Sequence, residues 1–165
     1  MTFLSALTEF LLCVGAVLAF CVLINTPRKT VLCSSVISGL AYVMYRLIFV
    51  ESGREILAYF VATVFISVAS EICARIYKKP STVFIFPGII PLVPGVGLYN
   101  SMYCLVQGDH AGFGVHAANT GFIAGAIAIA VAVVHIIARS SLVTRGKYHL
   151  PYRMKMFEEG DENSK

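Results

Sequence analysis

The sequence has few charged residues for its length, and this excludes most classes of water-soluble protein. Charged residues make up 13% of the 165 residues, against about 25% in a typical soluble domain. Ten of them fall in the last 27 residues (139–165), so the first 138 residues hold only 12. So few charges cannot cover the surface of a water-soluble fold. We therefore exclude a soluble enzyme, a secreted disulfide scaffold and a disordered chain, and expect an integral membrane protein.

Motifs of catalysis and metal binding are also missing. There is no GxSxG elbow, Walker loop or HExxH motif, and the five cysteines form no CxxC pair and no zinc-spaced cluster with histidine. We therefore expect no enzyme activity, no cofactor, no metal site and no ATP hydrolysis. The cysteines are interpreted as small apolar side chains. The formal charge of +4 comes from short basic clusters at the ends of apolar runs, which indicate membrane topology rather than nucleic-acid binding.

Five apolar runs are long enough to cross a membrane, which needs about 20 residues as a helix. They are residues 10–24 (extendable back to residue 3), 31–50, 56–77, 80–108 and 111–138. No base precedes the first run, and Glu9 interrupts it, so we expect it to be retained rather than cleaved as a signal peptide. The prediction is an all-α, five-span domain over residues 1–138. A flexible tail, first basic and then acidic, follows over 139–165.

The bases alternate between the two sides of the predicted bundle. The first loop carries Arg28 and Lys29, the third carries Lys78 and Lys79, and the tail is basic, whereas the second and fourth loops are poor in bases. This pattern places the amino terminus outside and the carboxyl terminus inside, in the bacterial cytoplasmic membrane. A re-entrant fourth segment is the alternative, but it would put the basic tail outside.

The fourth run contains three prolines in eight residues. Pro87, Pro91 and Pro94 each lack a backbone donor and obstruct the carbonyl four residues earlier, while Gly88 and Gly95 each follow a proline and permit unusual backbone angles. We expect an unwound stretch from Pro87 to Gly95, shielded inside the protein, with a half-helix that begins near Gly95. Broken helices of this kind build transport sites, although a kinked structural helix without a ligand is the alternative.

The fourth run also resembles the signature of a known family. The motifs are Pro80-Ser81-Thr82, Pro87-Gly88 and Pro91-Leu92-Val93-Pro94-Gly95, with Tyr99 after them; weaker echoes are Asn25-Thr26-Pro27 and the segment from Ser70 to Arg75. The chain resembles the carboxyl-terminal membrane half of the threonine/serine exporter family, which is related to the small component of the two-part succinate exporter. The resemblance implies a larger partner subunit and a substrate that is either a small hydroxy amino acid or a dicarboxylate.

Polar residues in the second and third runs are further candidates. Arg46 ends a polar stripe of the second run, and it either snorkels to the outer interface or binds a substrate carboxylate. Glu71 and Arg75 are four residues apart, so we expect them to pair. The pair either closes the bundle, or Glu71 takes up and releases a proton during transport.

The fifth run combines a small polar cluster with a face of small residues. His116, Asn119 and Thr120 form the cluster, and Asn119 is a candidate cavity residue. Small residues recur at a spacing of four (Ala117, Gly121, Gly125), which lets helices approach closely and permits homo-oligomerisation.

These observations favour a subunit of a secondary, proton-coupled exporter of small carboxylate metabolites, such as threonine, serine or succinate. A non-transporting membrane module that stabilises or anchors a partner is the alternative. The candidate translocation residues are Thr82, Pro87, Gly88, Pro91, Pro94, Gly95, Tyr99, Asn100, Arg46 and Asn119, and the candidate proton-coupling residues are Glu71 and Arg75.

Overall fold

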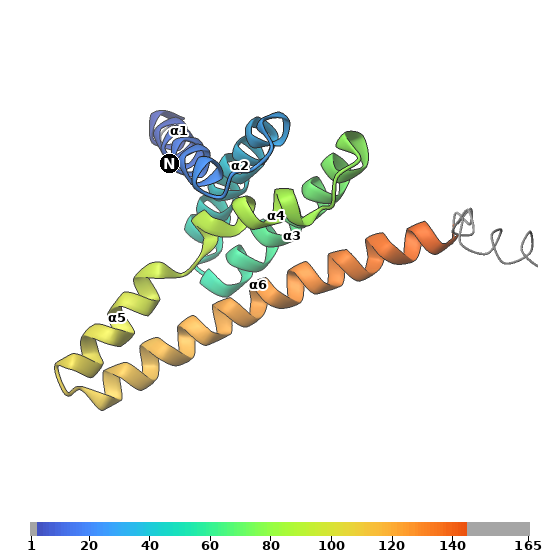
Figure 1. Cartoon of the computed structure of the whole chain (residues 1–165). Coiled ribbons are helices and arrows are strands. Elements are labelled where there is room, and N and C mark those ends of the chain that lie inside the picture. The colour runs from blue at the N-terminus through green and yellow to red at the C-terminus, as the bar shows by residue number, and fades with distance from the viewer. Residues whose placement is uncertain (1–2, 145–165) are drawn as a thin grey trace, which may run out of the picture.

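A computed structural model describes residues 3–144, and within them every regular element is a helix (Figure 1). In chain order the elements are α1 (Phe3–Leu23), α2 (Arg28–Ser52), α3 (Glu55–Tyr77), α4 (Thr82–Ile89), the 3₁₀ helix η1 (Ile90–Leu92), α5 (Gly95–Val106) and α6 (His110–Thr144). The all-α prediction is confirmed. α6 continues past the predicted limit at residue 138, and the rest of the predicted tail, 145–165, lies outside the described residues.

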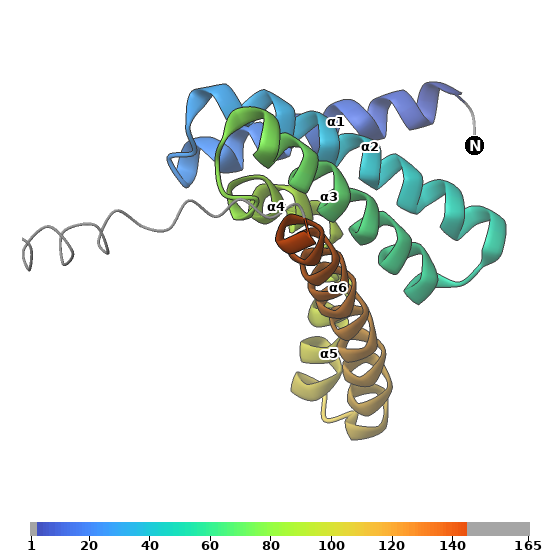
Figure 2. The ribbon, with the colours of Figure 1, turned by 90° about the vertical axis from the view of Figure 1, so that its right-hand side faces the viewer.

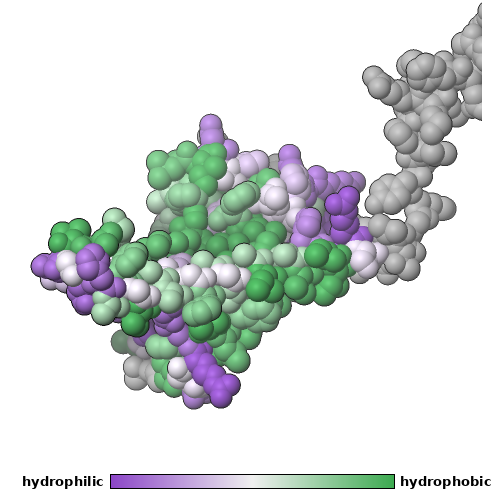
Figure 3. Space-filling view, turned by 90° about the horizontal axis from the view of Figure 1, so that it is seen from below, coloured by the Kyte–Doolittle hydropathy of each residue, from purple (hydrophilic) through white to green (hydrophobic). Residues whose placement is uncertain are grey.

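Four of these helices are long and apolar enough to span a membrane, and α4 with α5 makes a fifth if the bent pair counts as one span. The surface fits this assignment, because large apolar side chains along the helices face outward. Val106 is 81% exposed, Val96 76% and Phe122 67%. Figure 3 shows this apolar surface in green, with the hydrophilic residues gathered near the ends of the molecule. The chain is therefore a multi-pass membrane protein, with lipid as the solvent of its outer faces.

Contacts between helices give the direction of each span. Glu9 of α1 meets Arg46 of α2, and Cys33 of α2 meets Cys73 of α3, so these neighbours run antiparallel. α3 and α6 run in the same direction, because Glu55 contacts Asn119 near one end and Glu71 contacts His135 near the other. Figures 1 and 2 show α6 lying along α3. The chain crosses back between α3 and α6, which favours a broken span over a re-entrant loop for α4, η1 and α5.

The break in this span is shorter than the prolines predict. Only Val93 and Pro94 lie outside helices, and α4 and α5 meet at a bend of 53°. The prediction that a half-helix begins near Gly95 is confirmed. The prediction of an unwound stretch from Pro87 to Gly95 is wrong, since Pro87 lies inside α4 and Pro91 in the first turn of η1, where a missing donor is tolerated.

Packing on three sides holds α4 in place. α4 contacts α1, α2 and α3, and the hydroxyl of Ser38 in α2 donates to the carbonyl oxygen of Gly88 at 3.0 Å. A side chain at Gly88 would come within 2.9 Å of Ile66 in α3, so glycine lets the two helices lie close together. η1 contributes Leu92 to the core cluster, whose other members are Ile37, Ala41, Ala62 and Ile66.

Left-handed backbone residues stop the helices at the turns. Gly53 ends α2 at φ 63°, and its N–H donates to the carbonyl of Phe49. Gly108, at φ 76°, lies in the turn between α5 and α6. Glycine adopts these angles without steric cost. The short turns hold consecutive helices side by side, and the hairpin of α5 and α6 carries the chain away from α1 and α2 (Figure 2).

Oxidation of the purified chain is expected to join Cys33 to Cys73. Their Sγ atoms are 2.8 Å apart, and a disulfide needs about 2.05 Å, so bond formation requires only a small shift of the two side chains. Intact mass after copper-catalysed oxidation should show the loss of two hydrogens, and two thiols should no longer react under denaturing conditions.

The variant Cys13→Ser should still form this bond, whereas Cys33→Ser should not. If the oxidised wild-type protein keeps all five thiols, α2 and α3 do not pack with Cys33 beside Cys73.

Candidate functional site

A cavity of about 520 Å³ lies beneath the break, where four spans meet. Its volume falls within the range of small-molecule sites, roughly 300–1,000 Å³. The lining residues are Tyr42, Tyr45, Arg46 and Phe49 of α2; Glu55 and Tyr59 of α3; Pro91, Val93 and Pro94; Gly95, Val96, Gly97 and Asn100 of α5; and His116, Asn119 and Ile123 of α6. The cavity lies toward the end of the molecule that carries the turn between α2 and α3.

The structure brings six of the ten candidate translocation residues together around this cavity. They are Arg46, Pro91, Pro94, Gly95, Asn100 and Asn119. The other four lie elsewhere. Thr82 and Pro87 line a mainly apolar cavity between α4 and the end of α1. Gly88 is buried against α2 and α3. Tyr99 is 68% exposed and stacks on Tyr103 along the outer face of α5.

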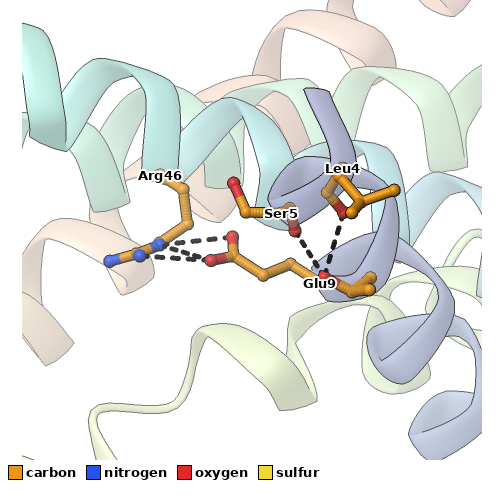
Figure 4. A network of polar contacts seen from close by, with 5 residues as sticks. Leu4, Ser5, Glu9 and Arg46 are labelled. Atoms are coloured by element: carbon orange, nitrogen blue, oxygen red, sulfur yellow. Dashed lines mark hydrogen bonds and ion pairs between the residues drawn. The ribbon is translucent and has the colours of Figure 1, made fainter. Parts of the chain in front are cut away.

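Arg46 is held by a carboxylate of the same chain. Its Nε lies 3.3 and 3.2 Å from the two carboxylate oxygens of Glu9, and its Nη2 lies 3.1 Å from Oε1 (Figure 4). Neither predicted alternative, snorkelling or an arginine reserved for substrate, included this pair. Glu9 is the single acid of the first run and Arg46 the single base of the second, which is the signal that points to it. Within the described residues, no group accepts from Nη1, so its donors are available to a ligand.

The first turn of α5 faces the cavity with its main chain. The N–H of Gly95 donates to the carbonyl of Val93 at 2.7 Å. The next N–H groups, of Val96 and Gly97, have no acceptor inside the helix, and they carry partial positive charge. Glycines at 95 and 97 leave this turn without bulky side chains. Gly97 also packs directly on Thr120 of α6, where a Cβ would collide with the Thr120 hydroxyl. This contact fixes the start of α5 against α6.

Aromatic and acidic groups of α2 and α3 form the opposite wall. The rings of Tyr45 and Tyr59 lie 4.4 Å apart, and Tyr42 packs on Tyr45 at 6.0 Å. Glu55, the first residue of α3, accepts a hydrogen bond of 3.4 Å from the Asn119 amide. Glu55 and Tyr59 were not predicted from the sequence. Glu55 lies at the edge of a loop and Tyr59 within an apolar run, and only the packing of α3 brings them to the cavity.

The predicted ion pair between Glu71 and Arg75 is wrong. Glu71 contacts Nδ1 of His135 in α6 at 3.2 Å, and no ion pair with Arg75 forms. The packing of α6 against α3 places the imidazole beside the carboxylate, while Arg75 is exposed. Glu71, Arg75 and His135 line a separate cavity of about 430 Å³ at the opposite end of the bundle. Among the described residues, no three His, Cys, Asp or Glu side chains form a metal-binding group.

Comparison with known proteins adds a family match. A family model described as "Threonine/Serine exporter, ThrE" matches residues 9–137. A curated protein of Haemophilus influenzae, itself described as uncharacterized, is 28% identical over 138 residues, which cover 79% of this chain and 46% of the relative. The chain therefore spans about half the length of this relative. No solved structure matches the chain.

The ion pair between Glu9 and Arg46 is expected to stabilise the packing of α1 on α2. Glu9→Gln should lower the free energy of unfolding in micelles by about 1 kcal/mol, as for other polar contacts between membrane helices, because it leaves the guanidinium without its counter-charge. Titration with a denaturing detergent, followed by circular dichroism, measures the change.

The exchanged variant Glu9→Arg/Arg46→Glu should recover most of the lost stability, since it restores an ion pair at the same place. Equal losses in the single and exchanged variants would show that the pair contributes nothing.

Proposed function

This chain belongs to the threonine/serine exporter family, and we propose that it is a membrane subunit of a secondary exporter of small carboxylate-bearing metabolites. Family membership supports transport across a membrane. The observation that carries the proposal is the cavity beneath the break, because one small space is faced by the start of a helix, a base and an acid. The helix start and the base match the carboxylate of an amino acid, and the acid matches its ammonium group.

The substrate carboxylate is assigned to the start of α5. Main-chain N–H groups at a helix start bind anions through hydrogen bonds and the helix dipole. Arg46 lines the same cavity, and the donors of its Nη1 can add a charge-assisted hydrogen bond. Glu9 fixes the orientation of this guanidinium, so little side-chain freedom would be lost on binding.

The substrate ammonium is assigned to Glu55 and the tyrosine wall. A carboxylate and the faces of aromatic rings both attract a cation. Asn100 and Asn119 line the same space and can bond a hydroxyl group. Glu55 also lines this space, and its charge would repel the second carboxylate of a dicarboxylate. The lining therefore favours threonine or serine over succinate.

A larger membrane partner of the same family is proposed to complete the pathway. The chain spans about half the length of its relative, and a five-span unit leaves the cavity open on one side of the bundle. Gly121 and Gly125 of α6 have no described residue from outside their own helical turns within 4 Å of an added Cβ, so their face is available to a helix of the partner or of a second copy. The bases at one end favour a bacterial cytoplasmic membrane with the carboxyl terminus inside.

Coupling to protons is proposed to use Glu71 together with His135. An ionisable group inside a span is costly and usually serves transport. The contact between the carboxylate and the imidazole provides two neighbouring groups that can share and pass on one proton. Because the pair joins α3 to α6, its protonation state can bias how these two spans pack.

Asn100→Ala and Asn119→Ala are each expected to raise the KM for threonine about fivefold, since each removes one hydrogen bond worth about 1 kcal/mol. The measurement is uptake of labelled threonine into inverted vesicles that contain this chain and its partner. Labelled succinate should be a poor substrate, and vesicles with this chain alone should be silent.

Tyr99→Phe is the matched control, because Tyr99 neighbours Asn100 in sequence but lies on the outer face of α5. Its KM should be unchanged. If all flux losses follow losses in the amount of assembled partner, the chain is a stabilising module and the transport proposal fails.

Glu71→Gln is expected to abolish the stimulation of uptake by a pH gradient, because glutamine cannot carry a proton, while exchange of threonine at equal pH persists. The same vesicles, assayed with and without the gradient, measure both rates. Arg75→Gln is the control, since Arg75 does not contact Glu71, and it should keep the stimulation. Full pH-driven uptake by Glu71→Gln would rule out the proton-coupling role.

A further inference from the structure

The cavity at the opposite end of the bundle from the candidate substrate site is rich in bases. Its lining includes Arg75 and Lys79 from the end of α3 and the turn after it, and Arg139 from α6. None of these three bases forms an ion pair with a described residue. The one acid in the lining, Glu71, is already engaged by His135. The cavity therefore carries a net positive charge that no group of residues 3–144 neutralises.

Hydroxyl groups and the shape of the site add to this charge. Ser81 and Thr82, at the start of α4, line the cavity beside the bases. Guanidinium, ammonium and hydroxyl groups together are the donors that bind a phosphate ester, since each phosphate oxygen accepts several hydrogen bonds. The site is about 430 Å³ in volume, which is ample for one phosphodiester group.

The surface below the bases is apolar. On α3, Ile72 and Ile76 share a stripe with Arg75, and they are 52% and 69% exposed. On α6, Ile136 lies next to His135 and is 66% exposed. Figure 3 shows hydrophilic surface gathered where α6 ends and hydrophobic surface farther along the molecule. A ligand that fits both parts has an anionic head and hydrocarbon chains.

We propose that this cavity binds the headgroup of an anionic phospholipid, with its acyl chains along the exposed faces of α3 and α6. Basic pockets between spans at the cytoplasmic side recognise such headgroups. Bound there, the lipid bridges the end of α3, the start of α4 and the end of α6, and it holds these three segments together. This inference does not depend on the identity of the transported substrate.

The test compares lipid retention by variants of the full chain. Native mass spectrometry of the protein in micelles is expected to show bound phosphatidylglycerol, and phosphatidylcholine at the same concentration should be retained much less. Each base near the lipid surface contributes about a fivefold change in binding. Lys79→Gln and Arg139→Gln should therefore each lower phosphatidylglycerol retention about fivefold.

Lys78→Gln is the matched control, because Lys78 neighbours Lys79 but does not line the cavity. Its retention should equal that of the wild type. Equal losses in Lys78→Gln and Lys79→Gln would mean non-specific attraction by charge, and equal retention of the two lipids would mean no headgroup site. Displacement of the lipid by millimolar inorganic phosphate would mean a site for free phosphate instead. Each of these three results overturns the proposal, and circular dichroism checks that every variant is folded.

Discussion

A polar main-chain group inside hydrocarbon has to find its partner within the protein, and the broken span of this chain shows how that requirement is met. Pro94 cannot donate, and the chain leaves helical geometry at Val93. The break borders the cavity between α2, α3 and α6, with Pro94 buried and Val93 about half exposed. The hydroxyl of Ser38 donates to the Gly88 carbonyl in the half-helix before the break. In the half-helix after the break, Gly97 packs on Thr120 of α6. The carbonyl and N–H groups that remain at the break border the cavity, where water or a ligand can bond them.

The same requirement explains where the charged side chains lie. Among the described residues, three contacts between helices involve an acidic side chain: Glu9 with Arg46, Glu55 with Asn119, and Glu71 with His135. Each gives an ionisable group a partner and at the same time sets the position of one span relative to another. Two of the three join α3 to α6, so these parallel helices are connected near both ends of their contact. A change of charge at either contact therefore acts on the relative position of the two spans.

Local rules allowed some of these features to be predicted from the sequence, and tertiary packing decided the rest. The start of α5 at Gly95 follows from Pro94, which cannot continue a helix, and the spans follow from uninterrupted apolar runs. Pro87 inside α4 could not be predicted, because the helices that pack around α4 come from distant parts of the sequence. The pairing of Glu71 with Arg75 was expected from their spacing on one helix, but His135 lies 64 positions away and reaches Glu71 only through the packing of α6. Six of the ten candidate translocation residues share the cavity, since the broken span and the polar faces of its neighbours converge there.

The length of α6 has a further consequence for the surrounding bilayer. Its apolar part, His110–Ser140, has 31 residues and measures about 46 Å at 1.5 Å per residue. The hydrocarbon layer is only about 30 Å thick, so the helix must incline steeply or draw the lipids around it into a thicker ring. A thinner bilayer therefore favours a larger tilt of α6. Because Gly97 of α5 packs on Thr120 of α6, a change in this tilt also moves the half-helix that borders the cavity.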